Sequence, residues 1–191
     1  MQIHRQYGHV KVAVSVVAGL TLLAGLFAYK YFAPVSNKAQ APTAAITPPP
    51  TMVGKPRPPF TMVDVEGKPQ NVDQWNGKVV LINFWATWCP PCRREIPAFI
   101  RLQEAYRDKG LVIVGIALDS QQAAIDYVDP MGINYPILVG EIDGISLTQR
   151  YGNELGVLPY SVIVDRNGVI QKTFLKEVTY EDAEKLISPY L

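Results

Sequence analysis

Two cysteines, Cys89 and Cys92, are the residues of this 191-residue sequence whose type and spacing point most directly to chemistry. They are the only cysteines of the chain, and they stand in the segment FWATWCPPC with only Pro90 and Pro91 between them. Two thiols at this spacing can form a structural disulfide, supply half of a metal site, or cycle between dithiol and disulfide.

A structural disulfide and a zinc site both fit the sequence poorly. A disulfide between Cys89 and Cys92 closes a loop of four residues, for which the loop-closure relation gives only about 2 kcal/mol. Zinc needs two further ligands, and the only histidines, His4 and His9, precede a long apolar segment. Carboxylates would have to complete such a site. We therefore expect no metal ion, no other cofactor, and a redox role for the pair.

The elements around the cysteines favour that redox role. The apolar residues 78–85 predict a buried strand that leads into Cys89, and residues 90–109 predict the helix that follows. The first N–H groups and the dipole of this helix favour a thiolate at its start. We therefore expect Cys89 to be the exposed nucleophile and Cys92, one turn into the helix, to resolve the mixed disulfide. The prolines lack N–H groups, so the N–H of Cys92 is the expected donor to the Cys89 sulfur.

Composition divides the chain into four parts. Residues 12–33 begin with an uncharged run of eighteen residues and predict a transmembrane anchor, with a cleaved signal peptide as the alternative. Residues 1–11 would then be a short cytoplasmic N-terminus. Residues 34–59 hold eight of the sixteen prolines and predict a linker, either an extended spacer or simply an unstructured stretch. Residues 60–191 predict one globular domain.

The globular part has the sequence pattern of an α/β domain. It carries twelve Lys and Arg against seventeen Asp and Glu, a net charge of 12 − 17 = −5, which disfavours nucleic-acid binding. Short Val- and Ile-rich runs alternate with amphipathic stretches, as in βαβ units around a mixed sheet. The predicted elements are a hairpin over 61–72, strands over 78–85, 111–118 and 135–139, helices over 90–109, 120–128 and 146–151, a hairpin over 160–175, and a helix over 179–187 capped by Thr179.

The segment NFWATWCPPCRREIP, residues 83–97, resembles the active-site segment of membrane-anchored thioredoxin-like proteins of the TlpA/ResA type. The resemblance covers about residues 60–191. It implies a thioredoxin fold, a central mixed sheet flanked by helices, here with an N-terminal hairpin extension. It also implies thiol-disulfide exchange on the outer side of a bacterial inner membrane, with a single-pass anchor and the C-terminal domain in the periplasm.

The resemblance assigns roles to single residues. Cys89 and Cys92 match the attacking and resolving cysteines. Glu95 matches an acid that the family often carries, and it lies three residues after Cys92, where a carboxylate can exchange protons with the buried thiol. The alternative is that Glu95 is a solvated acid that stabilises the helix dipole. Cytosolic thioredoxins carry a buried Asp where this chain has Asn83.

A second family element is a cis-proline that faces the disulfide, for which Pro159 in GVLPYSVIVD is the candidate. The alternative is an ordinary proline at a strand edge. Backbone groups before a cis-proline in this position can pair with an extended substrate segment. The expected substrate-binding residues are Trp88, Pro90, Pro91, Leu158 and Pro159.

These residues predict a periplasmic reductase of protein disulfides, for example in cytochrome c or copper-centre maturation. The chain has no further cysteine, so a separate membrane thiol donor would have to re-reduce it. A thioredoxin-like module that binds Cu(I) or a protein partner without turnover is the alternative. A thiol peroxidase fits less well, because its reactive cysteine normally follows Pro and Thr.

Overall fold

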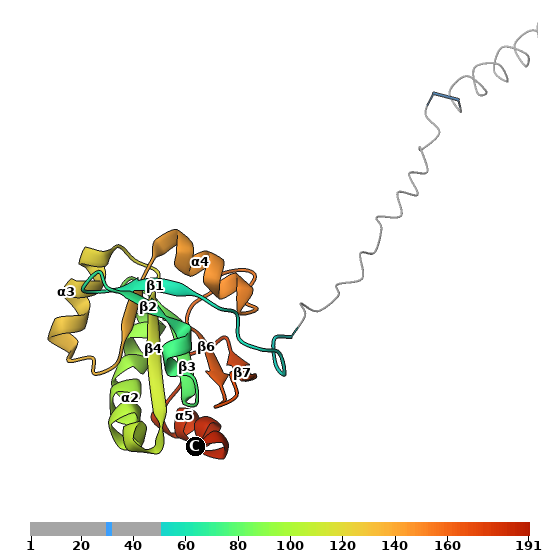
Figure 1. Cartoon of the computed structure of the whole chain (residues 1–191). Coiled ribbons are helices and arrows are strands. Elements are labelled where there is room, and N and C mark those ends of the chain that lie inside the picture. Colours follow the sequence, from blue (N-terminus) through green and yellow to red (C-terminus); the bar gives the residue numbers. More distant parts are fainter. Residues whose placement is uncertain (1–29, 32–50) are drawn as a thin grey trace, which may run out of the picture. The chain divides into compact units, whose positions relative to one another are not determined.

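The computed structural model of the chain describes residues 30–31 and 51–191 (Figure 1). The predicted N-terminus 1–11, nearly all of the predicted anchor 12–33 and most of the predicted linker 34–59 lie outside the described residues. Among the residues that are described, no helix has both the length and the apolar character needed to cross a bilayer.

A mixed sheet of seven strands forms the centre of the described domain, in the order β2-β1-β5-β4-β3-β6-β7 (Figure 1). The strands are β1 (Thr61–Asp64), β2 (Pro69–Asn71), β3 (Val79–Trp85), β4 (Leu111–Ala117), β5 (Ile137–Val139), β6 (Tyr160–Val164) and β7 (Ile170–Phe174). Strands β3, β4 and β5 are parallel, so their carboxyl ends meet at one edge of the sheet. Strand β3 leads directly to the cysteines, and this edge therefore carries the site.

Helices cover both faces of the sheet. The α-helices are α2 (Pro90–Tyr106), α3 (Gln121–Met131), α4 (Glu141–Arg150) and α5 (Tyr180–Ile187), and short 3-10 helices span Val72–Trp75, Arg107–Lys109 and Ser188–Tyr190. Helices α2, α3 and α5 contribute to one hydrophobic core, and α4 contributes to the core on the opposite face.

Strand β3 shows why the sheet is covered on both sides. All seven of its residues are buried, as its apolar sequence predicts. Successive side chains point to opposite faces, so Leu81 and Trp85 pack into the core under α2, whereas Ile82 and Phe84 pack into the core under α4. Burial of each of these large side chains stabilises the fold by about 2 kcal/mol.

Several predicted elements are confirmed, and others differ in extent. The helix predicted over 90–109 ends at Tyr106, and a 3-10 helix spans Arg107–Lys109. Both hairpins form, and Thr179 caps α5 by accepting a hydrogen bond from the N–H of Asp182. Helix α4 begins at Glu141, five residues earlier than predicted, and α3 continues through Pro130 to Met131. A proline in the last turn removes only one hydrogen bond, so α3 can extend that far. Strand β5 is shorter than predicted.

Part of the predicted linker packs against the domain. Pro56 forms an isolated bridge with Val169, and the N–H groups of Gly54 and Arg57 donate to backbone carbonyls of the β6–β7 hairpin at 2.7 and 2.8 Å. Prolines are tolerated at such a sheet edge because they need not donate there. The packed part of the chain therefore begins several residues before Phe60, where the composition had suggested that it starts.

Candidate active site

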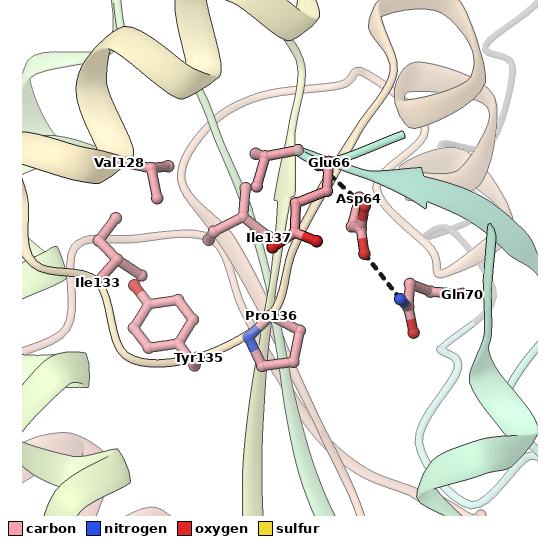
Figure 2. Close-up of a pocket in the computed structure, with 9 residues that line it drawn as sticks. Asp64, Glu66, Gln70, Val128, Ile133, Tyr135, Pro136 and Ile137 are labelled. Carbon is pink, nitrogen blue, oxygen red and sulfur yellow. Dashed lines mark hydrogen bonds between the residues drawn. The ribbon is translucent and has the colours of Figure 1, made fainter. Parts of the chain in front are cut away.

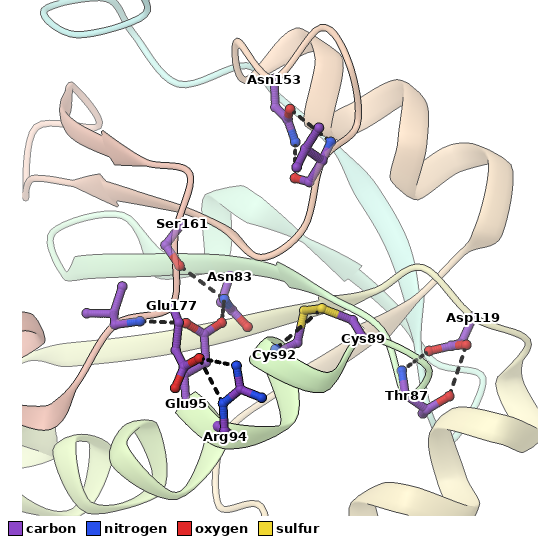
Figure 3. The surroundings of a disulfide bond; sticks show 12 residues. Asn83, Thr87, Cys89, Cys92, Arg94, Glu95, Asp119, Asn153, Ser161 and Glu177 are labelled. Atoms are coloured by element: carbon purple, nitrogen blue, oxygen red, sulfur yellow. Dashed lines mark hydrogen bonds and ion pairs between the residues drawn. A yellow bond between two sulfur atoms is a disulfide. The ribbon is translucent and has the colours of Figure 1, made fainter.

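Cys89 and Cys92 form a disulfide at the beginning of α2 (Figure 3). Cys89 is the N-cap residue of α2, with extended backbone, and its Sγ accepts a hydrogen bond from the N–H of Cys92 at 3.3 Å. Pro90 and Pro91 occupy the first helical positions, as the sequence predicts. The Cys89 sulfur thus lies at the positive end of the helix and has the one backbone donor that the sequence indicated.

The two sulfurs differ less in exposure than the sequence suggested. In the disulfide, Cys89 is only 4% exposed and Cys92 is 0% exposed, so the expectation of an exposed Cys89 is wrong for this state. The disulfide draws the Cys89 side chain toward Cys92 within the first turn of α2. The surface next to it is instead formed by Trp88, which is 67% exposed. Cys89 is still the more accessible of the two.

Glu95 is a buried carboxyl group on the same face of α2 as Cys92. It is 1% exposed, which contradicts the alternative of a solvated acid at the helix start. Its Oε1 accepts a hydrogen bond from the Nδ2 of Asn83 at 2.8 Å, and its Oε2 accepts one from the N–H of Val178 at 3.1 Å. Burial raises its pKa to about 8, although these two hydrogen bonds act in the opposite direction. A carboxyl group with this pKa can change its protonation state near neutral pH, and the proton-exchanging role of Glu95 stays a prediction.

Asn83 connects Glu95 to β6 (Figure 3). Its Nδ2 also donates to the Oγ of Ser161 at 3.0 Å, whereas its Oδ1 is buried and finds no hydrogen-bond partner among the described residues. Rotation of the amide by half a turn would bring Oδ1 to Glu95 and Ser161, both of which can donate when Glu95 is protonated. The Asn83 side chain can thus donate a hydrogen bond to the ionised Glu95 and, after rotation, accept one from the protonated Glu95.

The loop between β7 and α5 closes over Glu95. Arg94, next to Glu95 in the sequence, donates to the Oε2 of Glu177 from Nε at 2.9 Å and from Nη2 at 2.6 Å (Figure 3). The following residue, Val178, provides the N–H that binds Glu95. The charged pair on the outside and the backbone bond on the inside hold the loop against α2, which keeps water from the carboxyl group.

Asp119 is a functional-site residue that the sequence did not reveal. It follows β4 at the carboxyl edge of the sheet and is buried. Its two oxygens accept hydrogen bonds from the N–H of Thr87 at 2.7 Å and from the Thr87 hydroxyl at 3.2 Å (Figure 3). These bonds hold the turn that carries Trp88 and Cys89. The polar residue directly after a buried strand was the available signal.

Replacing Asp119 with alanine should lower the free energy of unfolding by about 1 to 3 kcal/mol, because the half-buried Thr87 donors lose their acceptor. Asp119→Asn should cost less, since its carbonyl oxygen can still accept from the Thr87 N–H. Urea denaturation measures both. Asp126→Ala is the control, because Asp126 is exposed and its side chain accepts from Gln122 alone within residues 51–191. Its effect should stay within about 0.5 kcal/mol. An Asp119→Ala variant as stable as the parent would contradict the clamping role.

The Leu158–Pro159 peptide bond is cis, as predicted. Tyr160, the next residue, pairs with Phe84 of β3, so Pro159 lies at the sheet edge from which Cys89 follows. The preceding loop is held by Asn153, which exchanges two hydrogen bonds with the backbone of Val157 at 2.8 and 3.2 Å. The fold therefore brings the two distant parts of the expected site to one edge, and the substrate-binding role of these residues stays a prediction.

A separate pocket of about 270 Å³ lies between the β1–β2 turn and β5 (Figure 2). Its polar groups already bind one another: Asp64 accepts from the N–H groups of Glu66 and Lys68 and from the Nε2 of Gln70. Glu66 forms an ion pair with Lys68. These contacts stabilise the hairpin extension, so the polar side chains of the pocket already have partners within it. Elsewhere in the described residues, no three metal-binding side chains come together.

Comparisons with known proteins agree with this geometry. The sequence pattern of the redoxin family matches residues 52–187. The thiol-disulfide oxidoreductase ResA of Bacillus thuringiensis (strain Al Hakam) is 33% identical over 141 residues, which cover 72% of this chain and 79% of that protein. The chain belongs to the redoxin family. Within it, the chain is a thiol-disulfide oxidoreductase of the TlpA/ResA type, and Cys89 and Cys92 are its CxxC pair.

Solved structures support the thioredoxin-like fold of this redoxin. A thiol:disulfide interchange protein from Chlorobium tepidum TLS has 30% sequence identity and a TM-score of 0.64, over 71% of this chain and 94% of that chain. A DsbF homologue from Corynebacterium diphtheriae has 28% identity and a TM-score of 0.64, over 70% and 85% of the two chains. The expected α/β fold, a mixed sheet flanked by helices, is thereby confirmed.

Proposed function

We propose that this ResA-type oxidoreductase reduces disulfides of protein substrates on the outer side of a bacterial inner membrane. The observation that carries the reductive direction is the sparse set of donors at Cys89. Strongly oxidising enzymes stabilise their reduced thiolate, which makes their disulfide easy to reduce. Here Pro90 and Pro91 offer no N–H, and among the described residues only the Cys92 N–H donates to the Cys89 sulfur. These few donors stabilise the Cys89 thiolate of the reduced form only weakly. The disulfide form is therefore favoured, which suits a role as electron donor.

The buried carboxyl group supports the same reaction. The Cys89 thiolate attacks the substrate disulfide, forming a mixed disulfide and releasing one substrate thiolate, which takes up a proton. Cys92 must then lose its own proton before it attacks the Cys89 sulfur and releases the second substrate thiolate. Glu95 lies one turn away on the same buried face, and its pKa of about 8 suits a group that accepts that proton. The enzyme ends as the disulfide that the structure shows.

The proposed location rests on the sequence. The apolar segment 12–33 would anchor the domain, and the Pro-rich segment 34–59 would separate it from the bilayer. A membrane thiol donor would re-reduce the domain, and anchoring would raise its effective concentration near that donor. Cytochrome c cysteines and copper-centre assembly proteins are the substrates we propose, because both require free thiols.

Trapping tests the proposal. A Cys92→Ser variant cannot resolve its mixed disulfide, so it should retain protein substrates covalently on Cys89 in the cell envelope of the native bacterium. Mass spectrometry then identifies them, and addition of dithiothreitol should release them. Recovery of no trapped protein, with copper bound to the wild-type chain, would instead support the Cu(I)-binding alternative. A reporter that is active only outside the cytoplasm, fused after Leu191, tests the orientation.

A further inference from the structure

Beside the disulfide, α2 and α3 form an open groove of about 390 Å³, whose lining includes Pro90, one of the expected substrate-binding residues. It is lined by Pro90, Arg93 and Arg94 from the first two turns of α2 and by Tyr127 and Met131 from α3. Tyr127 and Met131 are four residues apart and so share one face of their helix. Because Pro90 directly follows Cys89, a substrate chain joined to Cys89 begins next to this groove.

The two arginines of the groove differ in their partners. The guanidinium of Arg94 donates twice to Glu177, so its charge is already matched. Arg93 is exposed and forms no ion pair with any carboxylate in residues 51–191. Its guanidinium lies over Tyr127, with Cζ 5.7 Å from the ring centroid. Arg93 therefore keeps its N–H donors available at the mouth of the groove.

Tyr127 gives Arg93 a fixed platform. The Tyr127 ring lies 5.5 Å, centroid to centroid, from the ring of Trp85, which is buried at the end of β3. A guanidinium that rests on an aromatic ring keeps its in-plane N–H groups free, and their fork geometry matches a carboxylate. Met131, 36% exposed, adds an adaptable apolar wall for the methylene groups of a bound side chain.

The charge of the groove is opposite to that of the domain around it. Residues 60–191 carry a net charge of 12 − 17 = −5, yet an unmatched arginine lies beside the reactive disulfide, at the positive end of α2. Asp126 and Asp129 of α3 are close in sequence to Tyr127, but neither forms an ion pair with Arg93. The local field therefore favours an anionic group from a ligand.

We propose that this groove is a substrate subsite in which Arg93 binds the carboxylate of an Asp or Glu close to the substrate cysteine. The inference deepens the proposed function and rests on it, since it needs a protein substrate that joins Cys89. It makes acidic residues next to the target cysteine a determinant of specificity, and the groove supplies no reacting group.

Two cysteine peptides test the subsite, identical except that the residues flanking the cysteine are Glu in one and Gln in the other. The rate constant of exchange is measured for each, with the full-length chain in mild detergent. The reduced chain reacts with the peptide disulfides, and the oxidised chain reacts with the peptide thiols. The ratio of the Glu rate to the Gln rate should fall about three- to tenfold in Arg93→Gln. Because both peptides react with the same variant, a change in the intrinsic reactivity of its Cys89 thiol affects both rates equally and cancels in their ratio.

Two further variants make the test specific. Arg101→Gln is the matched control, because Arg101 also lies on α2 and also stacks on a tyrosine, Tyr180, with its Cζ 4.7 Å from the ring centroid. It should leave the ratio unchanged. Arg93→Lys, which keeps the charge but loses the fork, should retain part of the preference. An unchanged ratio in Arg93→Gln, or an equal loss in Arg101→Gln, would overturn the subsite.

The same measurements separate this inference from the proposed function. Exchange that proceeds only from the oxidised chain to the peptide thiols would contradict the reductive role, while the Glu to Gln ratio would still report on Arg93. Rapid reduction of both peptides with the same ratio in all variants would contradict the subsite and leave the reductive role supported.

Discussion

Replacing Cys89 with serine is expected to abolish disulfide exchange, lowering its rate by at least about a thousandfold. A serine hydroxyl stays protonated near neutral pH and cannot replace the thiolate as the attacking group. The reduction of a peptide disulfide by the pre-reduced chain, followed by mass spectrometry of the products, measures the effect. The fold should be retained, because the disulfide closes a loop of only four residues and contributes about 2 kcal/mol by the loop-closure relation.

Cys92→Ser is the matched control for this prediction. Its Cys89 still lies at the positive end of α2 and still accepts from the N–H of residue 92, so the first attack should proceed. The products should be one equivalent of mixed disulfide on Cys89 and one free substrate thiol, whereas the second substrate thiol stays bound. Trapping through Cys92 in a Cys89→Ser variant, with none in Cys92→Ser, would show that the roles of the two cysteines are reversed.

Replacing Glu95 with glutamine is expected to remove a large pH dependence of stability. Burial raises the pKa of Glu95 from its usual 4.5 to about 8, so the folded state holds a proton that the unfolded state releases between these values. The favourable contribution is complete below pH 4.5 and is lost as the pH rises through 8. Wild type should therefore lose about 4 kcal/mol relative to the glutamine variant between pH 5 and pH 8.5.

Urea denaturation of the oxidised chain at several pH values measures this difference. Glu104→Gln is the control, because Glu104 is an exposed residue of the same helix whose one ion pair in the described part of the chain is with Arg107. Its stability should follow the wild-type pH dependence. Parallel curves for wild type and Glu95→Gln would show that Glu95 does not change protonation in this range. If Glu95 accepts the proton of Cys92, the same variant should also slow release of substrate thiol by about a hundredfold.

The reactive centre was predictable because its parts are neighbours in the sequence. A buried strand, a short turn and a helix that begins with proline follow one another directly, so their order alone places Cys89 at a helix start. Strand β3, both hairpins and the Thr179 cap were likewise predictable from local patterns of apolar, turn and capping residues. The ends of α3 and α4 were harder to predict from the sequence, because packing against the sheet extends a helix beyond its local capping and periodicity signals.

The burial of Glu95 could not be predicted from its neighbours in the sequence. An acid in the first turns of a helix is as compatible with a solvated position as with a buried one, and the sequence left both readings open. The structure decides the matter because Asn83, twelve residues before Glu95, and Val178, 83 residues after it, bind its two oxygens. Ser161 completes the network from a strand 78 residues beyond Asn83.

The sequence by itself predicted the reaction class, since two cysteines at this spacing, a helix start and the resemblance of residues 83–97 to TlpA/ResA-type proteins favoured disulfide exchange over Cu(I) binding. Only the tertiary structure decided how that chemistry is tuned: which carboxyl is buried, that Asp119 holds the turn before Cys89, and that Arg93 is left without a carboxylate partner among the described residues. The reason is physical. The reactivity of a thiol is a property of the cysteine residue itself. Burial, hydrogen bonding and unmatched charge instead arise from segments that meet only when the sheet assembles.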